Sequence, residues 1–490
     1  FYLKVVFEQD ISKARNHNYT WIDPTRVSNL SELCPKILQL YNGLYVQANK
    51  MTGSWSFSTT DKRVLYWQFN QPCQYPYTQY KKPGNQKHVI NHKQLHDVNK
   101  LKLLFTKKPL EISRSAIGFT PVICFTDHCD FDTQQNLKTQ RLFLKKYNIK
   151  VTKGFFLNHY SKRENNASYE NDKDELKKWL DDGHELAYHS LTQSIKNKDE
   201  ALKEFKTFKP LIESKTWIDH GFQPYNLSLS ESENSTSNFS RVIKSKNIKY
   251  LWNYIDNASS HCGMINQLNA SQFTLKAIIK ATKEQDFTTR LSLIIKAILF
   301  YYYNSNEKST AYKKLSTMTK NLKNKPGLKS LISFLNVFLK LGNYLVKPLK
   351  SKKTINQIFP LSTYQPVIYT FDDFYVFQTL EMNDFNNGLC YHNLNNLKDD
   401  KGFCILHTYF SVPFTYHKGR FLKNDDTVNP LIVDNFEKLS DDIKNNYIWN
   451  PTLKELIEYI EPLFNSELKL DVNNRVVFTE YNHLLTRYIS

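Results

Sequence analysis

From residue 119 onward, short apolar stretches alternate with amphipathic ones, and this alternation restricts the possible fold more than any other feature. The apolar stretches have the length of buried strands and lie at residues 122–126, 154–157, 185–189, 216–219, 250–254, 367–371 and 403–407. Strands that alternate with helices form parallel sheets through right-handed crossovers. Seven such strands predict an α/β fold, namely a distorted, seven-stranded (β/α) barrel that is closed or incomplete.

One of the intervening helices has recognisable ends. In the stretch "NDKDELKKWLDDG", Asp172 can cap the helix, and Glu175 three residues later can complete a capping box. Leu176, Trp179 and Leu180 then form a buried stripe at helical spacing, and the glycine that follows is expected to end the helix.

The alternation also divides the chain, whose 490 residues are too many for one ordinary core. Residues 1–118 are predicted to form an N-terminal extension of mixed α/β structure, packed on the barrel, with a helical piece near 28–42. The barrel is expected over 119–264 and 356–490. Residues 265–355 lack the strand pattern and are predicted to be a basic helical insertion.

The positive charge of the chain is concentrated in this insertion. The net charge is +19, and residues 271–350 contain fifteen Lys or Arg residues against three acids. The stretches "FTLKAIIKA" and "LKSLISFLNVFLKLGNYL" are amphipathic, so their apolar faces either pack on the barrel or lie on an anionic membrane surface. We expect a Lys-rich helix around 313–329 to be exposed. Nucleic acid is disfavoured as the anionic partner because no DNA- or RNA-binding motif is present.

Cysteine usage and hydropathy exclude several protein classes. The seven cysteines are scattered and never form a Cys-x-x-Cys pair, which argues against a disulfide scaffold or a cysteine zinc knuckle. The nearest approach to a membrane span, "LSLIIKAILFYYY", is too short and contains Lys296. The chain begins at Phe1 rather than Met, which is compatible with a trimmed N-terminus. The compartment stays open, with the bacterial cytoplasm or the inner face of the cell envelope favoured.

Histidines and carboxylates gather at the carboxyl ends of the predicted strands, where α/β barrels carry their chemistry. The residues concerned are Asp127, His128, Cys129, Asp130 and Asp132 after the first strand, His189 after the third, Asp219 and His220 after the fourth, and His407 after the last. His184 lies on the same strand as His189 but about 16 Å before it, so the two cannot share one metal.

Histidine combined with carboxylate is the ligand set of a catalytic zinc or related divalent metal. Such a site uses three protein ligands and keeps an open position for water. A separate carboxylate then accepts the proton from that water, and a second group protonates the leaving group. The stretch "PVICFTDHCDFDTQQNL" can supply a ligand and a base from adjacent residues.

At three motifs the chain resembles the polysaccharide deacetylase family, whose members are metal-dependent carbohydrate esterases on a distorted (β/α) barrel. "FTDHC" takes the place of the family's Thr-Phe-Asp-Asp-Gly and is followed by "KKYNIKVTKGFF", similar to the family's Lys-Tyr-Gly-Ile-Lys-Ala-Thr-Phe-Phe. "GHELAYHSLTQS" is similar to the second motif, and "FCILHTY" to the last. The resemblance covers about residues 119–260 and 365–460.

The chain departs from the family's pattern at the metal ligands. His128 stands where the family has its metal-binding Asp, and Gln193 stands where it has its second histidine. The family's Arg-x-Pro-Tyr stretch is replaced by "DHGFQPYN", which lacks the arginine that steadies the base. We therefore expect a three-histidine site formed by His128, His189 and His220. Asp130 or Asp219 is the alternative ligand, or a partner of the ligands.

The resemblance implies a metal-dependent polysaccharide deacetylase. It would remove an acyl group, most often N-acetyl, from a polysaccharide or amino sugar by hydrolysing a C–N bond of a non-peptide amide. The cofactor would be a divalent metal, expected to be zinc. Asp127 would act as the base, His407 would protonate the leaving amine, and the backbone of Tyr225 would help to hold the oxyanion. The alternative is a catalytically degenerate barrel that binds a glycan or a membrane surface.

Overall fold

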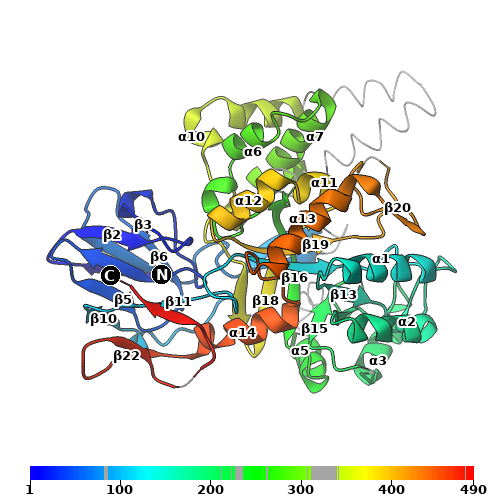
Figure 1. Ribbon diagram of the computed structural model, residues 1–490, viewed down its shortest axis with the longest axis horizontal. Helices are drawn as coiled ribbons and strands as arrows, with labels where there is room; N and C mark the ends of the chain where they lie inside the picture. The colour runs from blue at the N-terminus through cyan, green and yellow to red at the C-terminus, as the bar shows by residue number, and fades with distance from the viewer. Residues whose placement is uncertain are drawn as a thin grey trace.

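The structure is a computed structural model that describes residues 1–81, 86–210, 212–221, 223–226, 236–260, 263–305, 307–308, 310, 339, 341–415, 417–480 and 482–489. It consists of an N-terminal unit of antiparallel sheets, a parallel barrel, and a helical insertion between two strands of the barrel sheet (Figure 1).

Seven parallel strands form a closed barrel, which confirms the expected (β/α) barrel. In order around the barrel they are β12 (Val122–Asp127), β13 (Thr152–Phe155), β14 (Glu185–His189), β15 (Thr216–Ile218), β16 (Tyr250–Ser259), β18 (Phe374–Met382) and β19 (Phe403–Thr408). The pairing of β16 with β18 and that of β19 with β12 complete the ring.

One predicted barrel strand is wrong. The stretch at 367–371 forms β17 (Ile368–Phe371), which pairs antiparallel with β18 and lies outside the ring. Phe371 pairs with Phe374, so only Asp372 and Asp373 connect the two strands. Asp372 has a φ of 49°, the left-handed backbone that tight hairpin turns need. The chain therefore folds back without a helix, and β18 takes the barrel position.

Side chains of β12 alternate between two hydrophobic cores, as strand geometry requires. Val122 and Cys124 belong to the core that includes the residues of α14 (Leu453–Asn465), whose first backbone N–H groups bond to residues of β13 and β14. Ile123 and Phe125 belong to the core under the surrounding helices. By the same alternation, Asp127 faces the helices and the next residue faces the barrel interior.

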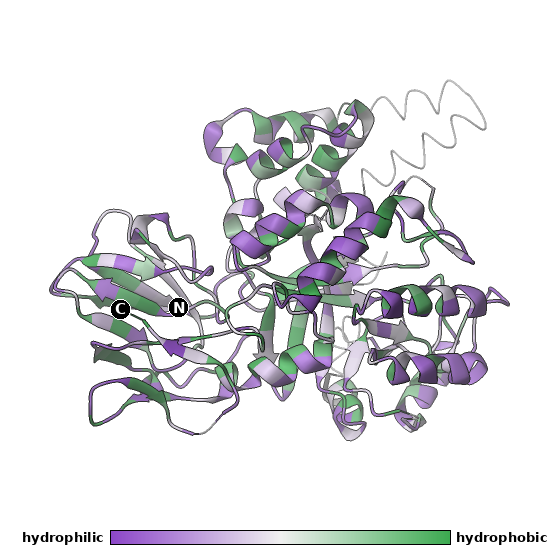
Figure 2. Cartoon of the chain, viewed as in Figure 1, coloured by the Kyte–Doolittle hydropathy of each residue, from purple (hydrophilic) through white to green (hydrophobic). Residues whose placement is uncertain are grey.

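Helices cover the outside of the barrel: α1 (Gln134–Lys146), α2 (Tyr169–Asp181), α3 (Lys198–Thr207), α5 (Thr236–Ser245), α11 (Phe385–Gly388), α12 (Tyr391–Asp399) and α13 (Val433–Lys444). Figure 2 shows apolar residues along the barrel strands and hydrophilic residues along α1 and α2.

The α2 helix begins earlier than its sequence predicts. Its N-cap is Ser168, whose side chain accepts from the backbone N–H of Asn171, whereas Asp172 lies inside the helix. The predicted cap at Asp172 is therefore wrong, because an earlier hydroxyl satisfies the free N–H groups first. Trp179 is buried as expected, but Leu180 is 40% exposed and does not belong to the buried stripe.

The N-terminal unit is built from antiparallel strands rather than from mixed α/β structure, so this part of the prediction is wrong. Its sheets contain β1 (Tyr2–Val6), β7 (Val64–Gln68) and β6 (Ser54–Phe57), and β10 (Leu103–Thr106), β5 (Tyr45–Ala48), β4 (Ile37–Leu40), β2 (Ile11–Arg15) and β3 (Trp21–Ile22). The predicted helix near 28–42 contains β4 instead. Smaller hairpins pair β8 (Pro76–Lys81) with β9 (Gln86–Asn91), and β11 (Leu110–Ile112) with the C-terminal β24 (Thr486–Tyr488).

The insertion packs an apolar face on the barrel. It contains α6 (Leu275–Ala281), α7 (Phe287–Lys296), a π-helix, η6 (Ala297–Tyr302), and α10 (Lys352–Ile355). Its residues Ile278, Ile298 and Leu299 share one core with Leu380 and Met382 of β18. The expected Lys-rich helix around 313–329 lies outside the described residues. In the part of the chain that the structure describes, no helix is both long and apolar enough to cross a membrane.

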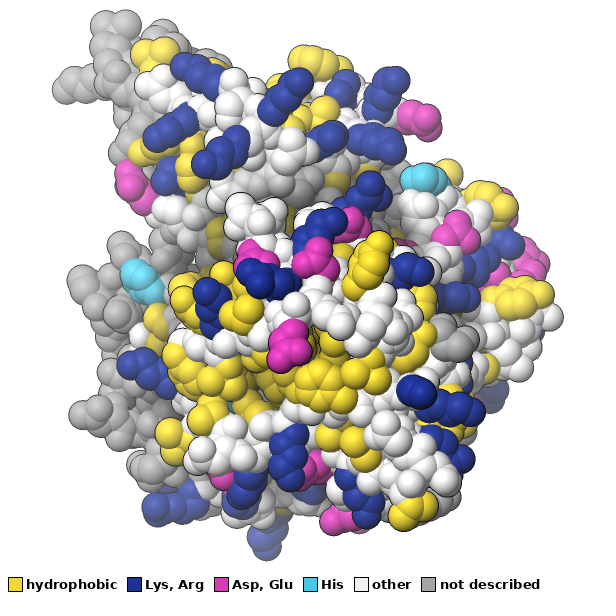
Figure 3. Space-filling model, turned by 90° about the vertical axis from the view of Figure 1, so that its left-hand side faces the viewer, with side chains coloured by type: hydrophobic (Ala, Val, Ile, Leu, Met, Phe, Trp, Pro, Cys, Tyr) yellow, Lys and Arg dark blue, Asp and Glu magenta, His cyan; other side chains and the backbone are white. Residues whose placement is uncertain are grey.

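The outer surface of the insertion is strongly basic. Figure 3 shows Lys and Arg side chains gathered over its upper part, with few acidic side chains among them. Exposed members on described residues include Lys276, Lys280, Lys283, Lys347 and Lys352.

Candidate functional site

Three side chains at the carboxyl ends of the barrel strands are close enough to hold one metal ion. The possible ligand atoms of His128, Asp130 and His189 all lie within 4.8 Å of one another. His128 follows β12 and His189 ends β14, and both are nearly inaccessible to solvent. Their ring centroids are 4.6 Å apart. The strand ends thus bring together residues that are 61 positions apart in the chain.

Asp130 is the centre of this group. Its Oδ2 lies 3.0 Å from Nε2 of His189, and its Oδ1 lies 2.8 Å from Nε2 of His220. Burial alone would raise the pKa of Asp130, but the imidazoles of His220 and His189 hold it well below its usual range. Asp130 is therefore an ionised carboxylate in contact with two histidines.

His220 takes a different place from the one predicted. It reaches the group through Asp130, and its ring packs against Phe156 at 5.0 Å and against His189 at 4.9 Å. The three side chains close enough to share one metal ion therefore include Asp130 and not His220, which the sequence favoured. The alternative ligand Asp219 is buried and accepts a bond of 3.0 Å from the indole of Trp217.

The protonation pattern of His189 fits a cation in this group. Its Nδ1 lies 3.2 Å from the carbonyl oxygen of Ile218, so we assign the ring proton to Nδ1. Burial lowers the pKa of His189 despite the nearby Asp130, which favours the neutral ring. Nε2 then faces Oδ2 of Asp130 at 3.0 Å, and because a carboxylate oxygen only accepts, either a second ring proton or a bound cation can join the two atoms.

His128 has the properties of a neutral ligand. Burial, together with the neighbouring His407 and His189, lowers the pKa of His128 well below its ordinary value. Its ring stacks on that of His407 with the centroids 3.9 Å apart. A buried neutral imidazole beside an ionised carboxylate offers the nitrogen and oxygen donors that zinc-like ions accept.

His407 forms a dyad with Asp256. Its Nδ1 lies 3.1 Å and 3.2 Å from the two carboxylate oxygens of Asp256. Burial acts to lower the pKa of His407, but Asp256 outweighs it and the pKa is raised. The Nε2 atom of His407 is buried and has no hydrogen-bond partner among the described residues. The ring therefore has a high proton affinity and one nitrogen available for chemistry.

Asp127, the predicted base, faces the other side of β12. One of its oxygens accepts from the Lys153 ammonium, and the other accepts from the Thr408 hydroxyl at 2.9 Å and from the backbone N–H of Phe410 at 2.8 Å. Burial raises the pKa of Asp127 to about 6, an effect that Lys153 opposes and Asp132 reinforces. Both oxygens are therefore engaged outside the histidine group, and this placement does not support a role as base.

A cavity of about 390 Å³ adjoins the dyad. Asp256 and Glu381 line it from the barrel, and Lys296, Phe300 and Tyr301 line it from the insertion. Lys296 forms an ion pair with Glu381, and the hydroxyl of Tyr301 donates to the same carboxylate at 3.4 Å. The insertion thus forms one wall of the space next to His407.

Sequence reasoning missed Asp256, although it follows a predicted strand by only two residues. The pairing of β16 with β18 shifts in register between Trp252 and Asp256, and Tyr254 has a φ of 62°. With this irregular pairing, β16 extends to Ser259, and Asp256 lies against His407. The carboxylate on an apolar strand, in "NYIDN", was the available signal.

No protein-family model, curated protein or solved structure matches the chain. The class that the fold and the site define is a closed (β/α) barrel with a histidine–carboxylate group at the carboxyl ends of its strands.

Proposed function

We propose that this chain is a metal-dependent hydrolase that removes an acyl group, with N-acetyl as the first candidate, from an amino sugar of a polysaccharide. The observation that carries the proposal is the position of the His128–Asp130–His189 group at the carboxyl ends of the strands, in contact with the His407–Asp256 dyad. The three motif resemblances supply the substrate class. A bound divalent metal, with zinc as the first candidate, would act as a Lewis acid on the amide carbonyl and on the attacking water.

The chain's own residues divide the remaining work. His128 and His189 would hold the metal through neutral nitrogens, and Asp130 would contribute the negative charge. His220 orients Asp130 through the bond of 2.8 Å to its second oxygen. In other metal sites, too, hydrogen-bonded residues outside the ligand set fix the orientation of the ligands.

The His407–Asp256 dyad is assigned both proton transfers. His407 accepts the proton of the attacking water, and Asp256 stabilises the imidazolium that forms. The same imidazolium then donates the proton to the leaving amine nitrogen. This assignment gives His407 the acid role expected from the sequence and transfers the base role from Asp127, whose oxygens are engaged with Lys153, Thr408 and Phe410.

Elemental analysis combined with an acetate-release assay tests the proposal. We expect the purified chain to contain roughly one divalent metal ion and to release acetate from N-acetylated oligosaccharides. His189→Ala should lose both properties. His184→Ala is the matched control, because His184 is a buried histidine just before the same strand whose Nδ1 accepts from the backbone N–H of Val151 at 3.2 Å. A metal-free wild-type chain that binds a glycan without cleaving it would contradict the proposal and support a purely binding role.

A further inference from the structure

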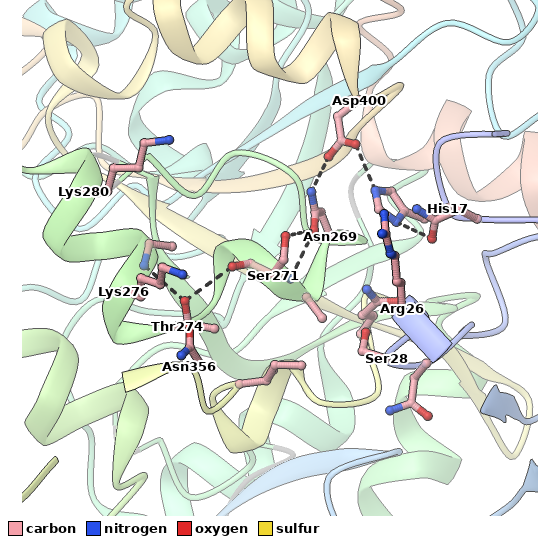
Figure 4. Close-up of a pocket in the computed structure, with 16 residues that line it drawn as sticks. His17, Arg26, Ser28, Asn269, Ser271, Thr274, Lys276, Lys280, Asn356 and Asp400 are labelled. Atoms are coloured by element: carbon pink, nitrogen blue, oxygen red, sulfur yellow. Dashed lines mark hydrogen bonds and ion pairs between the residues drawn. The ribbon is translucent and has the colours of Figure 1, made fainter. Parts of the chain in front are cut away.

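A second cavity, of about 610 Å³, lies where the N-terminal unit, the insertion and the barrel meet (Figure 4). None of its lining residues belongs to the candidate metal group or to the dyad. Arg26 and Ser28 come from the N-terminal unit, Lys276 and Lys280 from α6, and Asp400 from the segment after α12. Its size falls within the usual range of small-molecule sites.

Three cations line this cavity, of which Arg26 also interacts electrostatically with the exposed Asp23. Arg26, Lys276 and Lys280 are exposed, and none of them forms an ion pair among the described residues. Lys276 and Lys280 are four residues apart and so lie on one face of α6. Figure 4 shows them on one side of the pocket and Arg26 on the other. Unpaired cations from two separate units that converge on one cavity favour an anionic ligand.

The acid in the lining, Asp400, is bonded to other residues and not to these cations. Oδ1 of Asp400 lies 3.1 Å from Nε2 of His17 and accepts from Asn18 at 3.4 Å. Its Oδ2 accepts from the amides of Asn266 at 2.8 Å and Asn269 at 2.7 Å. All these bonds hold Asp400 in the wall, where it joins the N-terminal unit to the barrel. The three cations therefore remain available to a ligand.

The rest of the lining identifies the chemistry of that ligand. Half of the lining side chains are amides and hydroxyls, as in Ser28, Asn29, Ser271, Thr274 and Asn356, and only Ala270, Ala277 and Ile358 are apolar. Such a surface suits a polyhydroxylated molecule. No Phe, Tyr or Trp is present among the lining residues, and the ring of His17 is buried and held between Asn16 and Asp400, which disfavours stacking of a nucleotide base. An arginine can also bind two oxygens of one phosphate with its planar fork.

We propose that this cavity is a binding site for a carbohydrate that carries a phosphate group. The proposal concerns a site separate from the metal group and is independent of the proposed hydrolysis. A ligand bound to Arg26 and to the lysines of α6 would join the N-terminal unit to the insertion.

Calorimetric titration of the full chain with five probes tests the ligand class. The probes are a hexose 6-phosphate, the same hexose, the corresponding hexuronic acid, adenosine monophosphate and inorganic phosphate. We expect the hexose 6-phosphate to bind at least about tenfold more tightly than each of the other four. Equal binding of inorganic phosphate would overturn the sugar part of the proposal, equal binding of the hexuronic acid would overturn the phosphate part, and equal binding of the nucleotide would overturn the exclusion of a base.

Variants locate the site. The double substitution Lys276→Ala/Lys280→Ala should weaken binding of the hexose 6-phosphate by about tenfold or more, since it removes two of the three charges. Lys352→Ala/Lys353→Ala removes the same charge from exposed positions on α10 that do not line the cavity, and should change binding less than about twofold. Equal losses in the two variants would show that the ligand responds to the overall charge of the insertion, and this result would overturn the site. Thermal unfolding of both variants checks that the fold is retained.

Discussion

Residues 127–132 build two ionic clusters that face opposite sides of β12. The outer cluster contains Asp127, Asp132 and Lys153 and lies under the helices. The inner cluster contains His128, Asp130 and His189 and lies at the mouth of the barrel. The outer cluster is fully buried, whereas Asp130 of the inner cluster keeps 18% of its side chain exposed, and the carboxylates of both clusters come from the same acidic stretch.

The clusters differ in where their positive charge comes from. In the outer cluster the ammonium of Lys153 contacts both carboxylates, and Gln140 adds an acceptor at 2.9 Å. In the inner cluster the carboxylate oxygens of Asp130 contact imidazoles and no Lys or Arg side chain of the described residues, and burial lowers the pKa of both His128 and His189. A buried carboxylate needs a compensating charge. The outer cluster carries its own cation and is structural, whereas the inner cluster is suited to bind one from solution.

The largest expected effect comes from removing the inner carboxylate. Asp130→Ala should abolish metal binding and lower acetate release by about four orders of magnitude or more, because it removes one of three ligands. Asp127→Asn should keep the metal, and turnover should stay within about tenfold of wild type. Elemental analysis and initial rates measure both. If Asp127→Asn instead lost a hundredfold in rate with its metal retained, Asp127 would be the base after all.

Substitution of the dyad should affect catalysis without affecting the metal. His407→Gln is expected to lower kcat by about two to four orders of magnitude, the usual contribution of a general acid–base group. Asp256→Asn should give a smaller loss, because the imidazole remains but the charge that raises its pKa is removed. Metal content should be unchanged in both variants. A His407→Gln protein with wild-type rates would remove the dyad from the mechanism.

Breaking the outer cluster should affect stability instead. Lys153→Met leaves Asp127 and Asp132 buried without a cation, so we expect a loss of about 3–5 kcal/mol in the free energy of unfolding. Lys145→Met is the matched control. Lys145 pairs with Asp182 at 2.6 Å, but its side chain is 59% exposed, and such pairs contribute about 1 kcal/mol or less. Urea denaturation compares the two, and similar losses would show that the outer cluster is not the structural element inferred here.

The sequence was informative where a local pattern determines the structure. Apolar stretches bounded by helical ones located six of the seven barrel strands, and histidines at their ends located the inner cluster, because parallel strands end at one edge. Asp127 shows the limit of that reasoning. Its neighbour in the chain, His128, belongs to the inner cluster, but strand geometry turns adjacent side chains to opposite faces.

The remaining errors arose where distant residues decide the outcome. The segment at 28–42 contains β4, which is a strand because β2 and β5 pair with it on both sides. β18 was missed because a two-residue turn replaced the expected crossover helix. Asp256 reaches His407 only through the irregular pairing of β16 with β18. None of these pairings is visible in the residues of one segment alone.

The smallest predicted effect concerns a buried histidine outside both clusters. His184 packs against Trp179, and its Nδ1 accepts from the backbone N–H of Val151. Burial lowers the pKa of His184 from 6.5 to about 4. The native state thus favours the neutral ring, and the stability that this provides is present above pH 6.5 and is lost as the pH falls towards 4. Between pH 7.5 and pH 5 the loss should be about 2 kcal/mol.

His184→Gln isolates this contribution, because an amide oxygen can still accept from Val151 but does not titrate. Urea denaturation of both proteins at pH 7.5 and pH 5 gives the comparison. We expect the free energy of unfolding to fall by about 2 kcal/mol less in the variant than in wild type over this interval. Parallel pH dependences would mean that His184 is protonated in the native state as readily as in the unfolded chain. The inner histidines would then need to be reconsidered as well, since the same cause, burial, is what keeps His128 and His189 neutral.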